Sequence, residues 1–491
     1  MCWLLYKQIS NLLANFKDLN FFSKVIELSI LLICVIISAI VLIYKLARFE
    51  WLDKIAGLII ITLPFERIPS LDTPVGTLKI GYVLLGFGIL TLFALLLKKD
   101  SKLLALKLHP KSIWFLLFFV FSIPSWFFVK DFNRFLSTII ATIISFSAAV
   151  YVTNFSKNTF AYFKKLIFVF GFVMVFAVYQ FVGDFVGLPL YLTGIREGYS
   201  SLVFGIPRVH GTFIEPSYFA SGLTIVIYGI FFLIAADYNI ITKNIKGLKF
   251  DFIKNYRWVY ICYLALALGI FVATLSKSGW LSLGLSTVFI APLATKYNIK
   301  KILKYIAGVG LLAHLALAFV SLFSPFIQST LIGIIAHVIA TFELNNATSF
   351  ERASFFGVAL EILPKFAVTG IGSGQFGVVG SNLLSSFGDY ESIKTFLVLN
   401  AYLEVWLEFG LISFFIFIYL FFSSTFKNFA SIYRQKISNK SELFLKISFT
   451  FILITALIQW NFVSPVYLNH IFIILGCLLS LDFKDQIYEI K

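Results

Sequence analysis

The chain has 491 residues, of which 59% are hydrophobic and 13% are charged, and its mean hydropathy is +0.93. This composition leaves too little polar surface to cover a soluble globule of that size, so it excludes a soluble protein and indicates a chain solvated by lipid. The formal net charge of +16 could serve nucleic acid or a membrane surface. The positions of the basic residues decide between these partners.

Apolar stretches predict about twelve transmembrane helices in one integral membrane domain, 1–491. At the N-terminus, 25–44 has the length of a span, whereas 55–65 is apolar over only about half the length that a bilayer requires. If only one of the two crosses the membrane there are twelve spans, and thirteen is the alternative. No cleavable signal peptide is expected, because charged residues interrupt the first 24 positions. The other predicted spans are 78–97, 112–129, 134–153, 166–187, 218–236, 258–275, 279–294, 305–323, 398–423, 447–463 and 466–481.

Lysine and arginine are distributed unequally between the alternating connections. One set (98–111, 154–165, 237–257, 295–304, 424–446 and the tail from 482) contains 24, whereas the other (130–134, 188–217, 276–278, 324–397 and 464–465) contains 8. By the positive-inside rule, the first set is cytoplasmic and the second is outside. The basic charge therefore predicts orientation and contact with membrane lipids, with no nucleic-acid partner and a cytoplasmic C-terminus.

The longest outer loop, 324–397, contains three recognisable segments. The first, 326–342, is apolar enough to lie on the membrane, and 351–363 has the pattern of an amphipathic helix. The third, 370–380, is rich in glycine but is not followed by Lys-Ser/Thr, so a tight-turning connection is favoured over a nucleotide-binding loop.

The smaller outer loop, 188–217, ends in RVHGTFIEPSYFASGL. Pro216 suits the first turn of a helix, and Glu215 before it can interact with the free N–H groups of that turn. With Arg208 and His210 nearby, this helix start could bind an anionic group such as a diphosphate. The alternative is that Glu215 only caps the helix and that Arg208 reaches lipid headgroups.

Two further cations are expected on the outer side. Lys277 lies in the short connection LSKSG, where the charge rule disfavours lysine, and its alternative role is an interfacial anchor. Arg352 begins the amphipathic helix of the long loop. Together with Arg208, these residues could neutralise a lipid-linked diphosphate as it leaves.

The order of four segments resembles the O-antigen polymerase and O-antigen ligase superfamily, polytopic envelope glycosyltransferases of the GT-C type. The segments are RVHGTFIEPSYFASGL, ATLSKSGWLSLGL, FERASFFGVALEILPKFAVTGIGSGQFG and LNAYLEVWLEFGLISF. The early PFERIPSLDTPVGTLKIGYVLL, 64–85, is similar to the N-terminal part of the same fold. The resemblance implies a cofactor-free, metal-independent, inverting transfer of a glycan from a polyprenyl diphosphate carrier at the outer face of the cytoplasmic membrane. The implied partners are that lipid-linked oligosaccharide, membrane lipids and a chain-length regulator.

The resemblance also assigns roles to individual residues. Arg208 matches the cation before the G-x-F-x-(E/D)-P-(S/N) element, Lys277 stands where the family usually has arginine, and Arg352 opens the long-loop helix. The pattern H-N-x-Y-L-E followed by E-x-G, which implies acceptor or loop positioning, is matched by Asn400, Tyr402, Leu403, Glu404 and Gly410. Leu399 replaces the histidine of that pattern, and because ligases of the superfamily depend on this histidine, a repeat-unit polymerase is favoured.

Glycosyl transfer needs a base for the acceptor hydroxyl. Glu215 is the first candidate, because an ionised carboxylate accepts a proton without any pKa shift; His210 is the second and His470 the third. No metal site is expected, because Asp389 and Glu391 lie in a solvated loop segment and the four cysteines lie in or beside predicted spans.

Two other functions stay open at this point. A ligase would transfer the glycan to a lipid or protein acceptor. A transporter or flippase would be expected to have inverted repeats or ionisable residues deep within its spans. Asp184 and Glu361 are the nearest examples of such residues, and both are predicted close to the outer boundary.

Overall fold

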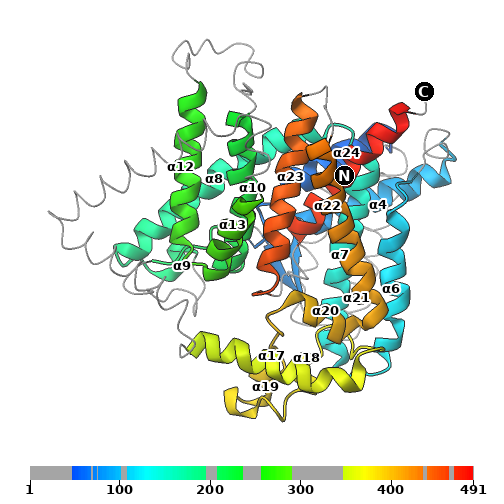
Figure 1. Ribbon diagram of the computed structural model, residues 1–491, viewed down its shortest axis with the longest axis vertical. Coiled ribbons are helices and arrows are strands. Elements are labelled where there is room, and N and C mark those ends of the chain that lie inside the picture. Colours follow the sequence, from blue (N-terminus) through cyan, green and yellow to red (C-terminus); the bar gives the residue numbers. More distant parts are fainter. Residues whose placement is uncertain are drawn as a thin grey trace, which may run out of the picture. The chain divides into compact units, whose positions relative to one another are not determined.

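The computed structural model describes residues 47–67, 70–73, 76–100, 108–194, 207–235, 256–289, 347–434, 440–463 and 469–489 (Figure 1). Two compact units divide the chain. The smaller comprises Met1–Leu52 and Gly86–Leu106, and the larger comprises Asp53–Leu85 and Lys107–Lys491. In the smaller unit, the rings of Trp51 and Phe87 stack with centroids 6.3 Å apart. The larger unit contains all the predicted site residues. The predicted spans 25–44 and 305–323 and the segment 326–342 lie outside the described residues.

Helices dominate, as predicted; the one departure among the described residues is a short antiparallel hairpin. Its strands, β1 (Ser70–Thr73) and β2 (Gly76–Lys79), pair with Ser70 opposite Lys79. The α-helices are α3 (Phe49–Ile61), α4 (Ile80–Leu97), α6 (Ser112–Trp126), α7 (Phe132–Phe155), α8 (Thr159–Phe185), α9 (Leu190–Thr193), α10 (Pro216–Ala235), α12 (Tyr256–Ala273), α13 (Lys277–Val288), α17 (Ala347–Phe366), α18 (Phe376–Val379), α19 (Tyr390–Ile393), α20 (Ala401–Phe409), α21 (Leu411–Ile418), α22 (Ser424–Arg434), α23 (Lys440–Gln459) and α24 (Asn469–Glu489), with a 3₁₀ turn η2 (Ser385–Phe387) and a π-helix η3 (Tyr419–Ser423).

Six helices of the described part are long and apolar enough to cross a membrane, by length and composition. Shorter apolar helices cover three more predicted spans, at 112–126, 258–273 and 470–482. These helices agree with the prediction of a helical, multi-pass membrane protein. The six longer ones are Ile80–Leu97, Phe132–Phe155, Thr159–Phe185, Pro216–Ile234, Leu411–Arg434 and Glu442–Gln459.

Helix α8 has the two faces expected of a helix between lipid and protein. Its exposed stripe includes Phe168, Phe172 and Val175, which are 63–69% exposed and recur at helical spacing. Its opposite face, with Phe170 and Met174, is buried. Large apolar side chains stay exposed on such a face because lipid solvates them.

Helices α10 and α23 are the most enclosed of the six long helices, each with 83% of its apolar window buried. Helix α10 is the one that follows Glu215. It packs against α12, α13 and α23. Three hydroxyl groups join it to two of these neighbours: the Tyr228 and Ser286 oxygens are 2.5 Å apart, and Thr455 Oγ1 donates to Ser286 Oγ at 2.8 Å. Such buried polar contacts fix neighbouring helices in lipid, where burial of apolar surface alone does not select a partner.

Helix α24 packs most extensively against α7. At Gly476, a Cβ atom would lie 2.7 Å from the carbonyl oxygen of Ala149, so only glycine allows this approach of the two helices. The small residue thus positions the start of α24, which carries His470.

One predicted span is wrong in its position. The apolar run 398–423 contains α20 and then a break at Gly410, whose φ of 85° and ψ of 170° are not helical. The long helix begins only at Leu411 and continues through η3 and α22 to Arg434. The apolar residues of α20 face a small core, and the sequence pattern does not distinguish that environment from lipid.

That small core belongs to the described part of the long predicted loop. Helix α17, which contains the predicted amphipathic segment 351–363, buries Phe355, Ala359, Ile362 and Leu363, whereas its charged residues Arg352, Glu361 and Lys365 are exposed. Figure 1 places α17, α18 and α19 together across one end of the helices. The cluster consists of Phe355, Ala359, Ile362, Leu363, Ile371, Phe376, Leu384, Ile393, Val398, Leu403 and Leu407.

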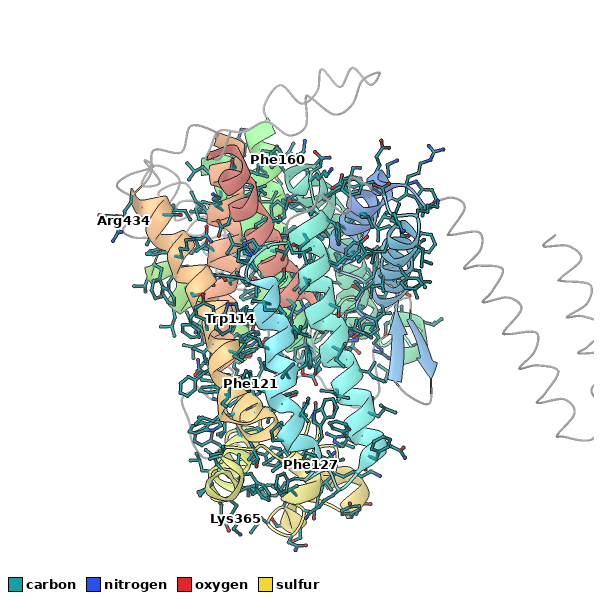
Figure 2. All side chains as sticks on the ribbon, turned by 90° about the vertical axis from the view of Figure 1, so that its right-hand side faces the viewer. Trp114, Phe121, Phe127, Phe160, Lys365 and Arg434 are labelled. Carbon is teal, nitrogen blue, oxygen red and sulfur yellow. The ribbon has the colours of Figure 1, made fainter. Side chains whose placement is uncertain are left out.

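The helices of the larger unit therefore have two ends. We call them the α17 end, marked by Lys365 and Phe127, and the α22 end, marked by Arg434 and Phe160 (Figure 2). Connections that the charge rule assigns to the outer side meet at the α17 end, where Lys130 and Asp131 donate backbone hydrogen bonds to Gln375. Connections assigned to the inner side meet at the α22 end.

Candidate functional site

Arg208 lies against the connection between α12 and α13. Its Nε donates to the carbonyl oxygen of Thr274 at 3.1 Å, and the adjacent Val209 N–H donates to Ala273 at 3.2 Å. Lys277 is the first residue of α13, three positions after Thr274. The structure therefore brings two of the three predicted diphosphate-binding cations onto adjoining segments.

The helix start at Lys277 is held close to α10. Ser276 caps α13 by accepting a hydrogen bond from the N–H of Gly279 at 3.2 Å. A Cβ atom at Gly279 would lie 2.8 Å from that of Ala220, so the two helices touch through small residues. The partial positive charge of a helix start thus lies beside Lys277, which favours an anion at this place.

Glu215 lies immediately before α10, as the sequence predicts. Its carbonyl accepts hydrogen bonds from two N–H groups of the first helical turn, and its carboxylate accepts one from Ser217 Oγ at 3.1 Å. The side chain is partly exposed. Glu215 therefore helps to start the helix, while its carboxylate stays accessible to a reactant.

His210 is fully buried, and neither of its ring nitrogens has a hydrogen-bond partner within the described part of the chain. Burial lowers its pKa to about 4, and the charge of Arg67 adds to this lowering. The ring is therefore neutral at pH 7. Its burial makes His210 less suited than Glu215 to meet an acceptor hydroxyl directly.

A glutamine that the sequence analysis missed holds the backbone next to His210. The Gln180 side chain, buried in α8, accepts from the Gly211 N–H at 2.8 Å and donates to the Gly211 carbonyl at 3.2 Å. Gly211 has a φ of +57°, which favours glycine. A lone amide within an apolar span was the available signal, because polar groups in spans need partners.

The segment 64–67 packs on the other side of the same loop. The Arg67 N–H donates to the Thr212 carbonyl at 2.8 Å, and Thr212 Oγ1 donates to the carbonyl of Pro64 at 2.5 Å. The resemblance included this segment, but the sequence analysis gave Arg67 no role. Its position beside His210 became visible only in the folded chain.

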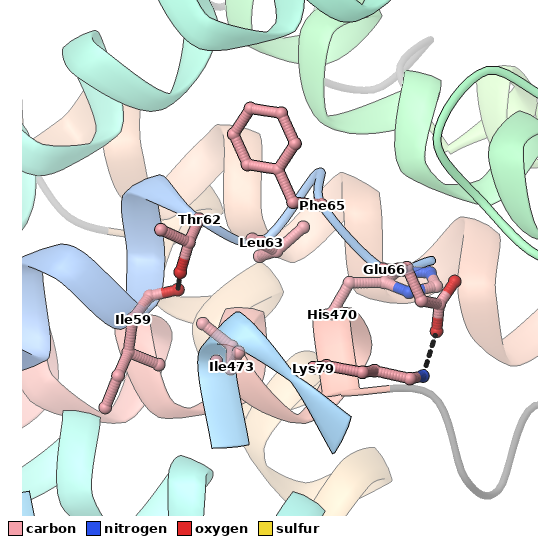
Figure 3. A pocket seen from close by; sticks show the side chains of 9 residues that line it. Ile59, Thr62, Leu63, Phe65, Glu66, Lys79, His470 and Ile473 are labelled. Atoms are coloured by element: carbon pink, nitrogen blue, oxygen red, sulfur yellow. Dashed lines mark hydrogen bonds and ion pairs between the residues drawn. The ribbon is translucent and has the colours of Figure 1, made fainter. Parts of the chain in front are cut away.

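A small cavity with a mainly apolar lining lies beside this segment (Figure 3). Glu66 Oε1 and Lys79 Nζ form a buried ion pair of 3.2 Å along it. Burial alone would lower the pKa of Lys79, but the Glu66 carboxylate and the neighbouring Tyr82 oppose this, and the pKa is raised. The cavity measures about 20 Å³, enough for about one water molecule and far too little for a sugar.

His470, the third candidate base, lines that cavity. Its Nε2 lies 3.1 Å from Ser221 Oγ of α10, and its ring meets that of Phe213 edge to face. It is 2% exposed. His470 thus supports the first turns of α10 through Ser221 and is too buried to meet an acceptor directly.

Asn400 and Tyr402 fasten α20 to the end of α23. Asn400 caps α20 by accepting from the Leu403 N–H at 3.0 Å, and its amide donates to the Asn461 carbonyl at 3.2 Å. The Tyr402 hydroxyl donates to the Leu457 carbonyl at 2.6 Å. Contacts of this kind position a loop, which is one of the two roles that the resemblance implies.

The end of α23 also connects the remaining predicted residues. Arg352 is exposed on α17, and its guanidinium donates to the Phe462 carbonyl. Gln459 donates to the Ser217 carbonyl at 3.0 Å, so α23 reaches the helix start that follows Glu215. Arg352 therefore belongs to the same end of the molecule as Arg208 and Lys277, linked through residues 457–462. Glu404 is fully buried in α20.

The glycine-rich segment forms a tight turn. Gly370, Gly372 and Gly374 have φ values of 80°, 95° and 71°, and the Gly374 N–H donates to the Glu408 carboxylate at 2.7 Å. The Gly374 N–H is thus already bound by a carboxylate of the chain itself. Within the described residues, no group of three or more His, Cys, Asp or Glu could hold a metal ion, and Asp389 caps α19 through the Ser392 N–H.

Compared with known protein families and with curated proteins, the chain matches no family model and no individual protein. The functional interpretation therefore depends on the residues and on their arrangement at the α17 end.

Proposed function

We propose that this protein polymerises polyprenyl-diphosphate-linked oligosaccharide repeat units into an envelope polysaccharide of the O-antigen or capsule type. The observation that carries the proposal is the Arg208–Thr274 hydrogen bond, which joins Arg208 to the connection that leads to Lys277. The partly exposed carboxylate of Glu215 belongs to the same loop as Arg208. Two cations, two helix starts and one accessible carboxylate are what a metal-independent transfer from a diphosphate carrier requires.

In the proposed reaction, the acceptor hydroxyl attacks the anomeric carbon from the face opposite to the diphosphate. The carbon–oxygen bond to the diphosphate breaks, and its electron pair goes to the phosphate oxygen. Arg208, Lys277 and the start of α13 stabilise the negative charge that develops there. The hydroxyl proton passes to Glu215, and the configuration at the anomeric carbon is inverted.

The proposal includes a location and a topology. The protein lies in the bacterial cytoplasmic membrane with about twelve spans and a cytoplasmic C-terminus, and 188–217 and 324–397 face outside. The distribution of lysine and arginine supports this orientation. The hydrogen bond from Lys130 to Gln375, which joins two predicted outer connections, also supports it, as do the bonds from Arg208 and Arg352 to the last residues of two predicted spans.

Polymerase is favoured over ligase because Leu399 occupies the position of the ligase histidine. The backbone at Leu399 has a φ of +58°, a conformation that histidine adopts more readily than leucine. The chain thus keeps a backbone that suits the family pattern while it lacks the imidazole. A transporter is disfavoured, since Glu361 is exposed on α17 and Asp184 lies at the last turn of α8.

Loss of the gene tests the assignment. For a polymerase, single repeat units should be found on the final acceptor, because a separate ligase still transfers them. Long polymers that accumulate on the polyprenyl carrier would instead identify a ligase and contradict the proposal.

Purified protein in nanodiscs provides the direct test. Incubated with polyprenyl-diphosphate-linked repeat units, it should lengthen the lipid-linked glycan, and a Glu215→Gln preparation serves as the control. Movement of the lipid-linked sugar across vesicles without any joining would instead identify a transporter.

A further inference from the structure

A second and larger cavity lies at the α22 end. Its volume is about 180 Å³, which is room for several water molecules. It is bounded by the segment before α6, by η3 and α22, and by α24. Its lining residues are His109, Pro110, Lys111, Trp114, Tyr419, Lys427 and Asp482.

Lys111 directs its ammonium group into the polar part of this region. Nζ donates to Ser423 Oγ at 3.0 Å and to Ser424 Oγ at 2.7 Å, and it lies 5.8 Å from the ring centre of Tyr419. An ammonium group has three N–H donors, so one is left for a ligand. Burial lowers the pKa of Lys111 to about 8; Asp482 opposes this effect and Lys427 adds to it. A bound anion would relieve the cost of burying this charge.

His109 is a second polar group of the lining. Its Nδ1 accepts a hydrogen bond from the Lys111 N–H at 3.1 Å, and burial, aided by Lys111 and Lys427, lowers its pKa to about 4. The ring is therefore neutral at pH 7 and adds no positive charge to the cavity. Its bond to the Lys111 N–H holds the backbone from which the Lys111 side chain extends.

The charges around the cavity leave a positive excess. Asp482 is occupied by neighbours, since it accepts from Asn428 at 2.9 Å and lies 3.8 Å from Lys446. Lys446 also pairs with Glu442 at 3.4 Å. Three lysines (Lys111, Lys427 and Lys446) therefore face two carboxylates (Asp482 and Glu442).

Two aromatic side chains complete the lining. The rings of Trp114 and Tyr419 lie with centroids 4.9 Å apart. Tryptophan and tyrosine are enriched at the depth of lipid headgroups, where one part of the ring is wet and the rest is apolar. Lys427 lies two helical turns before the end of α22 and is exposed, which opens the cavity to a ligand.

We propose that this cavity binds a phosphate anion, supplied by the headgroup of an anionic phospholipid. Lys111 and Lys427 would hold the phosphate oxygens, and Trp114 and Tyr419 would contact the glycerol region. The inference is independent of the proposed glycosyl transfer, because none of these residues belongs to the α17 end. A headgroup bound between α6, α22 and α24 would link three helices that meet at the α22 end.

Thermal unfolding of the purified full-length protein in detergent tests the proposal. Short-chain phosphatidylglycerol should raise the melting temperature saturably, whereas the matching diacylglycerol, which lacks phosphate, should not. Lys427→Gln and Lys111→Gln should each weaken the phosphatidylglycerol response about fivefold, as expected for one lysine at a lipid surface. Lys365→Gln, an exposed lysine on α17, is the matched control and should leave the response unchanged.

Two further arms identify the ligand. Asp482→Asn removes a nearby negative charge and should strengthen the phosphatidylglycerol response; a weaker response would indicate a cationic ligand and overturn the proposal. A saturable response to inorganic phosphate alone, lost in Lys427→Gln, would support the phosphate site and assign it to a soluble anion. An unchanged melting temperature with both ligands, or a wild-type response in Lys427→Gln, would overturn the proposal. Because Lys427 is exposed, its variant decides the matter even if Lys111→Gln fails to fold.

Discussion

The two ends of the helices are joined by different chemistry. At the α17 end, four amide side chains bind backbone groups of neighbouring segments: Gln180, Gln375, Asn400 and Gln459. These amide contacts do not titrate and are little affected by salt. Two arginines add contacts to the backbone, since Arg208 donates to the Thr274 carbonyl and Arg352 to the Phe462 carbonyl.

At the α22 end, charged side chains themselves join the helices. The Asp53 carboxylate accepts from the Lys157 N–H at 2.6 Å and from the Tyr162 hydroxyl at 2.9 Å, tying α3 to α8. Lys111 binds the α22 end of the long helix, and Lys446 joins α23 to α24. One end is therefore held mainly by bonds from side chains to the backbone, and the other by ion pairs and hydrogen bonds of charged side chains.

The largest effect is expected from cysteine labelling in intact cells, because an impermeant reagent either reaches a cysteine or does not. With single cysteines on a cysteine-free background, Ser386→Cys should react with an impermeant thiol reagent in intact cells, and Arg434→Cys should react only after lysis. The reason is that lysine and arginine gather in the connections of the α22 end. The reverse pattern would invert the orientation and exclude an outer active site at the α17 end.

Glu215→Gln separates a base from a helix cap. The amide can still accept from Ser217, so α10 should start normally, but it cannot take a proton. Polymer formation should fall by about 100- to 10,000-fold, which is the usual contribution of general base catalysis. The measurement is the rate of glycan lengthening by purified protein, with the melting temperature as a check on folding. Near-normal polymer from a well-folded variant would reject Glu215 as the base and move His210 forward.

Arg208→Ala removes a charge from the proposed diphosphate site, and Arg352→Ala removes another. Charge-assisted contacts of this kind contribute about 2–4 kcal/mol in the transition state, so turnover should fall roughly 30- to 1000-fold. Arg352→Lys should recover only part of the loss if the contact is bidentate. Lys365→Ala, on the same end, is the control. Equal activities of Arg208→Ala and Lys365→Ala would refute the diphosphate site.

One buried histidine at each end predicts how the stability of the protein depends on pH. His210 at the α17 end and His109 at the α22 end both have a pKa near 4 in the folded chain, against 6.5 when unfolded. The unfolded chain binds more protons between these values, so the stability present above pH 6.5 is lost as the pH falls towards 4. At pH 5 each histidine should cost about 2 kcal/mol. His210→Gln and His109→Gln should each reduce the drop in melting temperature between pH 7.5 and pH 5, and an unchanged drop in both would contradict the burial argument.

The smallest effect is expected for Lys277→Arg. The resemblance places arginine at this position, and the side chain lies at a helix start where either cation suits an anion. Activity should stay within about threefold of wild type, whereas Lys277→Gln should lose about tenfold or more, as expected for a charge-assisted hydrogen bond. If Lys277→Gln were fully active, Lys277 would be an interfacial anchor.

The sequence predicted helix positions best where the length of an apolar run was enough to identify a transmembrane helix. The expected spans 134–153 and 218–236 correspond to α7 (Phe132–Phe155) and α10 (Pro216–Ala235). It failed at α20, because Leu403 and Leu407 have the same apolar character whether they face lipid or the cluster under α17. The hairpin was missed because strands of four residues are too short for an alternating pattern to be recognised.

The sequence analysis selected site residues by their charge, so it missed residues that act through uncharged groups or through contacts with distant segments. Arg208 and Lys277 were selected because cations are rare on that side of the sequence. Gln180 carries no charge, and the pairing of Glu66 with Lys79 depends on a turn that the sequence did not predict. Contacts between distant segments need the fold, which periodicity and charge do not supply.

The π-helix η3 changes the rotational phase of the long helix Leu411–Arg434. An inserted residue in an α-helix turns everything after it by about 100° relative to an uninterrupted helix. Before it, Ser413 donates to the Phe118 carbonyl of α6; after it, Asn428 donates to Asp482 of α24. Deleting one residue between Tyr419 and Ser423 would keep a continuous helix but would rotate Asn428 and Lys427 away from α24. The helix from Leu411 to Arg434 thus presents one face to α6 before η3 and a differently oriented face to α24 after it. The inserted residue sets the angle between these two faces.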